Sequence, residues 1–404
     1  MAVLTYSTMS AIRIQRYIIK EISIPTLLSL LIFTFVLLMG RIPRVTELVI
    51  NKGVPASEIL QLFGYLMPTF LSITVPLSFL LGILLAFGRF SAESEFVALK
   101  ASGISLYTLV KPVLLLGIFF VLLTGWMTVS VEPSSKAAFR EKLFQIASNN
   151  LSISVKPGVF TDEFDGLVLY ARGTNEKLEM MQDVFISDQR NGTTPAIITA
   201  QQGRFLSDPD NLRLTLRLTD GSIHRQPEDN KQSTYQIIRF TTYDININVG
   251  GPLTNAKKKY RKRSELSWHE LNSAIDNNSQ KTAINRLQAE KHERIVIAFA
   301  PLTLVLVGVP LGLQSQRSGK GAGFALALVV FLVYYVLLSF AGTIADKGVI
   351  PSGIILWLPN IAFLLGGSYF LHRTATEKPL QIFTLPQRLR AAWKTMNSDS
   401  GNKE

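Results

Sequence analysis

The sequence predicts an α-helical polytopic membrane protein with six transmembrane helices, grouped three plus three, and an all-β domain inserted between the two groups. Two observations predict this class. Six stretches contain no Asp, Glu, Lys or Arg, and each is at least 19 residues long: 22–40, 65–87, 113–131, 295–313, 322–345 and 353–371. Between the third and fourth stretches, residues 132–292 have an ordinary polar composition and include runs in which apolar and polar residues alternate.

Each charge-free stretch is long enough to cross a membrane as a helix. A rise of about 1.5 Å per residue lets roughly 20 residues cover a hydrocarbon core of about 30 Å. A helix also satisfies its own backbone where lipid offers no hydrogen-bond partner. The alternative, a soluble protein, would have to bury all six stretches inside one globule. Five prolines inside the stretches predict kinks rather than helix ends: Pro68, Pro76, Pro301, Pro310 and Pro359.

The first stretch is expected to remain in the protein as its first span. It is full length, and Met39-Gly40-Arg41-Ile42-Pro43 follows it instead of a small-x-small cleavage site. Orientation then comes from basic residues in the short flanks. Arg13, Arg16 and Lys20 precede the first span, and further basic residues follow the sixth. The opposite loops hold fewer, so we expect both termini in the cytoplasm.

The polar insert is expected to fold outside the membrane as a β domain. In LRLTLRLTDGSIHR (212–225), Leu212, Leu214, Leu216 and Leu218 alternate with polar residues, which predicts a strand with one apolar face. That face would form the core of the domain. Further strands are predicted at 167–170, 184–186, 196–199 and 235–249, and tight hairpin turns at Asn191-Gly192 and Asp220-Gly221. The domain is then a sandwich, a jelly roll or a half-open barrel.

After the strands, a basic run and two helices lead to the fourth span. The run KKKYRKR (257–263) would lie outside against the charge bias, but long segments translocate largely regardless of charge. Ser267-Trp268-His269-Glu270 has the form of a capping box, so a helix should begin there. Asn277-Asn278 interrupts it, and a second helix from about Ser279 should continue into the span.

The sequence contains no motif for catalysis or metal binding. It has no cysteine, which excludes disulfides, thiolate catalysis and Cys-based metal sites. His292-Glu293 begins like a zinc-protease motif, but Val296 stands where the second histidine is needed. The loop 312–320 differs from a phosphate-binding loop, because its glycines are seven residues apart and Gly321 replaces Ser or Thr. We expect no cofactor, no nucleic-acid partner and no nucleotide hydrolysis by this chain.

Charged residues return abruptly in RFSAESEFVALKASGIS, residues 89–105, between two apolar stretches. This segment predicts a short helix over 91–103. Ser91 can cap its start, and Glu93 and Glu95 suit the positive end of the helix dipole.

The rest of this short helix has an apolar side and a natural end. Phe96, Val97 and Leu99 supply the apolar side, Lys100 lies near the negative end, and Gly103 is a natural stop. Two roles fit: a connector lying on lipid headgroups, or a docking site for a cytoplasmic protein. On the residues alone the connector is the simpler interpretation, although an anionic inner leaflet would mildly repel two acidic groups, which counts slightly toward the protein partner.

Arg41, Arg44 and Lys52 form a second charged group, at the outer end of the first span. Charges this close to hydrocarbon either anchor the helix or contact a ligand. If they face inward, the planar fork of arginine would suit a phosphorylated lipid.

Several local signatures now coincide, and the chain resembles the LptF/LptG family of lipopolysaccharide export permeases, the membrane subunits of an ABC transporter. The resemblance covers nearly the whole chain, and it looks closer to LptF than to LptG. The matching features are Arg16-Tyr17 with Glu21, Ala92-Glu93-Ser94-Glu95-Phe96, Ala101-Ser102-Gly103-Ile104-Ser105, Gly203, Ala289-Glu290 with Arg294-Ile295, and Val309-Pro310-Leu311.

The resemblance implies a domain organisation in the bacterial inner membrane. Residues 1–131 would hold the cytoplasmic N-terminus and three spans, with a coupling helix at 91–103. Residues 132–292 would form a periplasmic β-jelly-roll domain plus a helical linker. Residues 293–372 would be the last three spans, and 373–404 a cytoplasmic tail.

It also implies a function and partners. The chain would be a permease subunit that takes lipopolysaccharide from the inner membrane and passes it to a periplasmic bridge toward the outer membrane. Its partners would be a second homologous permease, a cytoplasmic LptB-like ATPase dimer, a single-span LptC-like protein and a periplasmic LptA-like bridge. The alternative is a membrane-anchored β-domain interaction protein without transport activity.

The resemblance finally implies roles for individual residues. Glu95 would contact the ATPase, as part of a coupling helix with Glu93, Phe96, Leu99, Lys100 and Gly103. Arg41 and Arg44 would meet the phosphates of lipopolysaccharide, whereas Lys52 keeps an anchoring role.

Overall fold

A computed structural model of the chain describes eleven stretches of it: residues 2–41, 43, 55–154, 157–164, 166–175, 180–190, 196–208, 213–225, 236–247, 262–314 and 322–376. The chain divides into two compact units. The first comprises Met1–Gly40, Met67–Pro133 and Leu266–Glu404, and the second comprises Arg41–Leu66 and Ser134–Glu265.

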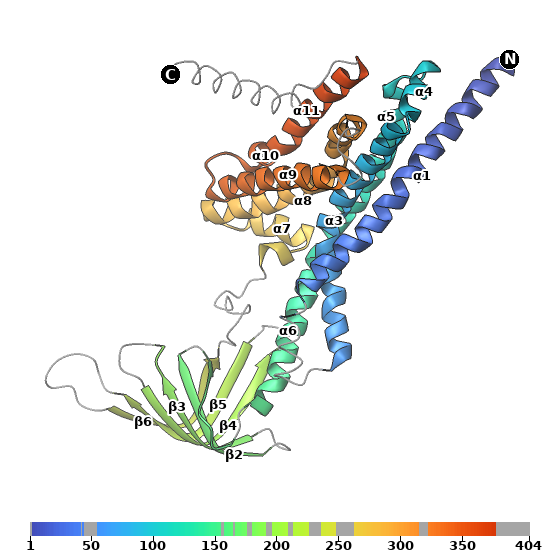
Figure 1. The fold of residues 1–404 in the computed structure, drawn as a ribbon. Coiled ribbons are helices and arrows are strands. Elements are labelled where there is room, and N and C mark those ends of the chain that lie inside the picture. Colours follow the sequence, from blue (N-terminus) through green and yellow to red (C-terminus); the bar gives the residue numbers. More distant parts are fainter. Residues whose placement is uncertain are drawn as a thin grey trace, which may run out of the picture. The chain divides into compact units, whose positions relative to one another are not determined.

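Six helices among the described residues are long and apolar enough to cross a membrane, which confirms the six predicted spans (Figure 1). Several of them extend beyond their charge-free stretch, because the helix continues into polar or charged residues at its ends. In chain order they are α1 (Ala2–Met39), α3 (Ala56–Ala92), α5 (Leu106–Trp126) continued by a π-helical turn η1 (Met127–Val131) and α6 (Glu132–Ser154), α8 (Lys281–Gln314), α9 (Ala322–Lys347), and α10 (Ser352–Ile355) with α11 (Leu358–Ala375).

The prolines behave in two ways. Pro68 and Pro76 lie inside α3, and Pro301 and Pro310 lie inside α8, so these helices continue through them as predicted. Pro359 is different, because it stands in the first turn of α11 after a break that follows α10. A proline lacks the N–H that the first turn leaves unused, so Pro359 starts a helix instead of kinking one.

The central helices of the first unit are α3 and α8. In their most apolar windows 83% and 72% of residues are buried, against 22% for α1 and α9. Glycines let the two backbones approach: a side chain at Gly308 would meet Leu80 and Ile83, and one at Gly312 would meet Phe87. The outer helices therefore keep wide apolar surfaces, as lipid-facing helices do.

A buried polar group ties three helices of this unit together. Asn360 of α11, only 2% exposed, accepts a hydrogen bond from the Tyr334 hydroxyl of α9 at 2.9 Å. Its amide donates to the Val296 carbonyl of α8 at 3.0 Å, and the Thr303 hydroxyl lies 3.4 Å from its oxygen. Such bonds between apolar helices fix their relative register.

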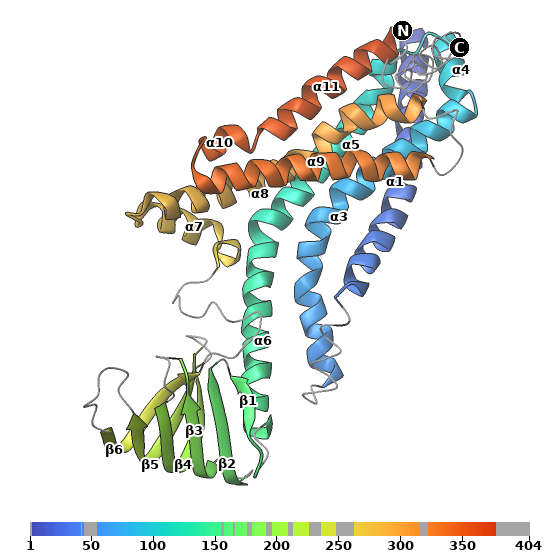
Figure 2. The same cartoon turned by 60° about the vertical axis from the view of Figure 1, so that its left-hand side comes forward.

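The second unit contains a six-stranded antiparallel sheet, which confirms the inserted all-β domain (Figure 2). Each strand pairs with the next in the chain, so the topology is a meander. The strands are β1 (Thr161–Phe164), β2 (Leu167–Asn175), β3 (Met180–Asp188), β4 (Ala196–Asp208), β5 (Arg213–Arg225) and β6 (Gln236–Ile247). Over their described residues, all five predicted strand regions fall on these strands: 167–170, 184–186, 196–199, 212–225 and 235–249.

The period-two pattern of β5 creates the core of this sheet. Leu214, Leu216 and Leu218 are 2%, 1% and 0% exposed and belong to one hydrophobic cluster, whereas Leu212 lies outside the described residues. On the opposite face, Arg217 forms a bidentate pair with Asp244 of β6, with both N–O distances 2.8 Å. This pair holds the pKa of the Asp244 carboxyl below its ordinary value through its hydrogen bonds.

Arg190 shows that the sheet curls. Its guanidinium donates to both oxygens of Asp188 at the end of β3, at 2.9 and 2.8 Å, and to the Asn246 carbonyl of β6 at 2.7 Å. Because β3 and β6 are not neighbours in the sheet, this contact requires curvature. Burial alone would raise the pKa of the Asp188 carboxyl, but the hydrogen bonds and charge of Arg190 outweigh it and lower that pKa.

The hairpin predicted at Asp220-Gly221 is wrong. Both residues lie inside β5, where Gly221 pairs with Ala200 of β4 on one side and Phe240 of β6 on the other. Asp220 has a positive φ of 52°, a backbone conformation typical of turns, but here it is only a local irregularity within the strand. Two flanking strands hold β5 extended on both sides, which outweighs the local signal. The other predicted turn, Asn191-Gly192, lies outside the described residues.

The helical linker follows its prediction. α7 (Trp268–Asp276) begins with a complete capping box, in which Ser267 accepts from the Glu270 N–H at 3.3 Å and Glu270 accepts from the Ser267 N–H at 2.8 Å. Asn277 caps its other end, and α8 then runs without interruption into the fourth span.

Candidate functional site

The short helix between spans two and three is α4 (Glu95–Ala101), and it begins later than predicted. Ser91 does not cap it. Ser91 lies in the last turn of α3, is 3% exposed, and donates to the Leu313 carbonyl of α8 at 2.5 Å. Because a backbone acceptor of another helix takes this hydroxyl, α3 continues to Ala92, and Ser94 becomes the residue before α4 with a φ of 58°.

The end of α4 is the predicted one. Gly103 has a φ of 83°, a conformation that glycine adopts without a Cβ penalty. Its N–H donates to the Lys100 carbonyl at 2.9 Å, and the Ile104 N–H donates to the Leu99 carbonyl at 3.1 Å. This pair of bonds is the Schellman arrangement, so Gly103 fixes where α5 can begin.

Only part of the predicted apolar side of α4 faces inward. Phe96 and Leu99 pack against the hydrophobic cluster that contains Ile18 of α1 and Leu106 of α5. Val97 is 60% exposed, so it lies on the outward side. Positions three apart share a helix face and adjacent positions do not, which explains the difference.

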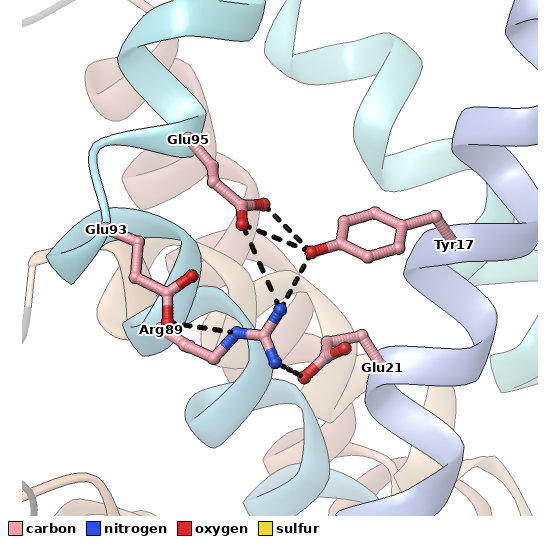
Figure 3. Close-up of polar contacts among 5 residues, drawn as sticks. All are labelled: Tyr17, Glu21, Arg89, Glu93 and Glu95. Carbon is pink, nitrogen blue, oxygen red and sulfur yellow. Dashed lines mark hydrogen bonds and ion pairs between the residues drawn. The ribbon is translucent and has the colours of Figure 1, made fainter.

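The acidic front of α4 meets a guanidinium, as Figure 3 shows. Arg89, in the last turn of α3, lies 2.5 Å from a Glu21 carboxylate oxygen of α1 and donates to the Tyr17 hydroxyl at 2.8 Å. Its charge also lies 3.6 Å from Glu93 and 3.9 Å from Glu95. We call these five residues the Arg89 cluster.

Tyr17 is the direct link between α1 and α4. Its hydroxyl lies 3.2 and 3.0 Å from the two carboxylate oxygens of Glu95, to which it donates, while accepting from Arg89. Its ring packs on Phe90 with 5.6 Å between centroids. The order Arg89, Tyr17, Glu95 is therefore a continuous hydrogen-bonded relay across three helices.

The Arg89 cluster carries an excess of negative charge. Three carboxylates surround one guanidinium, so these groups sum to a formal −2 at neutral pH. The Arg89 and Glu93 side chains are 41% and 53% exposed, and each single ion pair contributes only about 0–1 kcal/mol. An exposed, under-neutralised carboxylate group at a helix start suits a cationic partner.

Sequence reasoning identified Glu93 and Glu95 but missed Tyr17, Glu21 and Arg89 as members of one site. A signal existed for two of them, because Tyr17 and Glu21 are four residues apart and share one helix face. Nothing in the sequence shows that they meet Arg89, which lies 72 residues from Tyr17.

The predicted lipid contacts are described only in part. Arg41 is exposed, two residues beyond the end of α1. Arg44 and Lys52 lie outside the described residues, so the lipid-contact role stays a prediction.

Six long apolar helices, with an antiparallel sheet inserted in the sequence between the third and the fourth, are the architecture of a polytopic membrane protein with a β domain. A family model described as "Lipopolysaccharide export system permease LptF/LptG" matches residues 16–373. The chain therefore belongs to the LptF/LptG family of permeases, which are transporter subunits and not themselves enzymes.

Two curated proteins are similar to most of the chain. The lipopolysaccharide export system permease protein LptF of Escherichia coli (strain K12) is 23% identical over 358 residues, covering 87% of this chain and 92% of that protein. An uncharacterized protein of Rickettsia prowazekii (strain Madrid E) is 21% identical over 340 residues, covering 82% of this chain and 92% of that protein.

Proposed function

We propose that the chain is the permease subunit of an ABC transporter that extracts lipopolysaccharide from the inner membrane and passes it to a periplasmic bridge. A separate ATPase would supply the energy by docking on α4. The observation that carries this proposal is the position of α4, whose acidic start is bonded to α1 and α3 through the Arg89 cluster. A force on α4 therefore reaches two spans directly.

The surface of α4 suits a docked protein. Phe96 and Leu99 fix its inner side to the bundle, so a partner meets a helix that is already formed. Val97 at 60% exposure and the Glu93 side chain at 53% exposure are accessible. A partner with a basic side chain beside an apolar patch would complement this surface, because charge complementarity sets orientation and association rate.

The orientation and partners belong to the same proposal. The basic flanks support cytoplasmic termini, which puts α4 on the cytoplasmic side and the β domain in the periplasm. The proposed domain limits are 1–131, 132–292, 293–372 and 373–404. The proposed partners are a second homologous permease, an LptB-like ATPase dimer, an LptC-like protein and an LptA-like bridge, as the family membership supports.

Arg41 and Arg44 are the proposed contacts for lipid phosphates. Arg41 is exposed just beyond α1, and a guanidinium offers paired donors to phosphate oxygens. Replacing both with glutamate should reduce crosslinking of the permease to lipopolysaccharide. Unchanged crosslinking would return both residues to an anchoring role.

The coupling role of Glu95 is tested by co-purification and reconstitution. The tagged permease should bring down an ATPase, and Glu95→Ala should weaken that association and stop lipopolysaccharide release from vesicles. Glu141→Ala is the matched control, because Glu141 is an exposed glutamate on α6, outside the Arg89 cluster. If the wild-type chain binds no ATPase, the spans only anchor the β domain, and the interaction-protein alternative replaces this proposal.

A further inference from the structure

We propose that Tyr17 and Arg89 are positioning residues that hold Glu95 in competition with the docked partner, so that docking at α4 releases α1 from α4. This inference rests on the proposed function, because it assumes a cationic group that reaches Glu95. It goes further by assigning the step that follows docking. Before docking, the Tyr17 hydroxyl is hydrogen-bonded to the Glu95 carboxylate. After docking, a cationic side chain of the partner would be bonded to that carboxylate instead.

Competition follows from the geometry of the carboxylate. Both oxygens of Glu95 lie within 3.2 Å of the one Tyr17 hydroxyl, whereas its nearest contact to Arg89 is a longer 3.9 Å. A guanidinium or ammonium that approached Glu95 closely would need the same oxygens. An ion pair adds a Coulomb attraction between opposite charges that a neutral hydroxyl donor lacks, so the cation would displace Tyr17.

Charge favours the exchange as well. The Arg89 cluster has a formal charge of −2, so one added cation reduces the repulsion among Glu21, Glu93 and Glu95. Arg89 contacts Glu21 at 2.5 Å independently of Glu95, so the exchange would break the link from α1 to α4 and leave the Arg89–Glu21 pair intact. Arg89 acts on Glu95 through Tyr17, because its own hydrogen bond ends on that hydroxyl.

α1 is the span on which this release would act. Among its described side chains, the buried ones recur about every four residues and so lie along one narrow stripe of the helix: Ile18, Ile22, Thr26, Ser29 and Thr34. Only 22% of its most apolar window is buried, so little packing opposes its movement. The helix is continuous to Met39, two residues before Arg41. A displacement at Tyr17 would therefore be carried along one continuous helix as far as Met39.

The decisive variant is Tyr17→Phe, which removes the hydroxyl and keeps the ring on Phe90. The charge of Glu95 is unchanged, so this variant separates competition from docking. If Tyr17 competes with the partner, the ATPase should bind the variant permease more tightly, by about three- to tenfold. Lipopolysaccharide released per ATP should fall by about tenfold, because docking no longer changes the α1 to α4 contact.

The matched control is Tyr107→Phe. Tyr107 is also an exposed tyrosine close to α4 in sequence, and its hydroxyl bonds to His372 of α11 at 3.2 Å. A merely structural role for Tyr17 predicts weaker or equal ATPase binding, as for this control. Equal or weaker binding by Tyr17→Phe than by Tyr107→Phe would therefore overturn the proposal.

A distance measurement tests the release itself. The chain has no native cysteine, so Lys20→Cys on α1 and Ala98→Cys on α4 accept spin labels at two exposed positions. In the full complex in lipid vesicles, addition of ATPase and nucleotide should shift or broaden the distance distribution. An unchanged distribution overturns the release of α1.

These results also separate the two proposals. If the wild-type permease neither binds the ATPase nor releases lipopolysaccharide, the proposed function fails. If it does both and Tyr17→Phe behaves as Tyr107→Phe, only the positioning role fails.

Discussion

The buried ion pair at the start of the fourth span offers a sharp test of how this fold is held. Arg294 donates to Glu290, one turn earlier on α8, at 3.1 Å and to the Leu266 carbonyl at 2.9 Å. The Arg294 backbone carbonyl accepts from Thr128 in the π-helical turn at 3.1 Å. The perturbations are Glu290→Leu, Arg294→Met and the double variant.

The magnitude follows from burial. The Arg294 and Glu290 side chains are only 6% and 13% exposed, so water screens this pair little. Removing one partner of a buried pair takes that attraction from the remaining buried charge and costs about 3–5 kcal/mol. A loss of about 3 kcal/mol lowers the folded-to-unfolded ratio by roughly a hundredfold. Replacing both charges with apolar side chains of similar volume costs much less.

Reversible unfolding in mixed micelles, followed by tryptophan fluorescence, would measure these free energies. Glu290→Leu should lose about 3–5 kcal/mol, and adding Arg294→Met should recover about 2 kcal/mol or more of it. Glu58→Leu is the control, because its 3.6 Å pair with Lys142 has side chains 32% and 19% exposed and should matter less. A double variant less stable than Glu290→Leu would refute the reasoning.

Other parts of the chain give three more tests. Asn360→Ala should lower the free energy of unfolding by about 2 kcal/mol, measured in the same micelles, because two short buried hydrogen bonds are lost. Asp188 has a lowered pKa beside Arg190, so its contribution to stability is present above its ordinary pKa and lost as pH falls through the lower folded value. Asp188→Asn should therefore flatten the loss of β-domain stability below about pH 4, seen by circular dichroism. Gly103→Ala, at a φ of 83°, should cost about 1 kcal/mol and reduce ATPase co-purification; unchanged association would show that the α4 end need not be fixed.

The sequence by itself determined the features that depend on local chemistry or on a short period. The length of the charge-free stretches specified the six spans, because the hydrocarbon core of a membrane excludes unpaired charges and backbone groups that are not hydrogen-bonded. Alternation specified the buried leucines of β5, and the signature around Ser267 specified the start of α7. Gly103 ended α4 as expected, since its left-handed conformation is a property of the residue.

Only the tertiary structure decided the features that depend on which segments become neighbours. Ser91 had the chemistry of a cap, yet the Leu313 carbonyl from the other half of the chain took its hydroxyl. Asp220-Gly221 had the chemistry of a hairpin, yet pairing with β4 and β6 kept it inside a strand. The Arg89 cluster joins groups separated by 72 residues, and no local pattern reports such a contact, because it exists only after α1 packs beside α3.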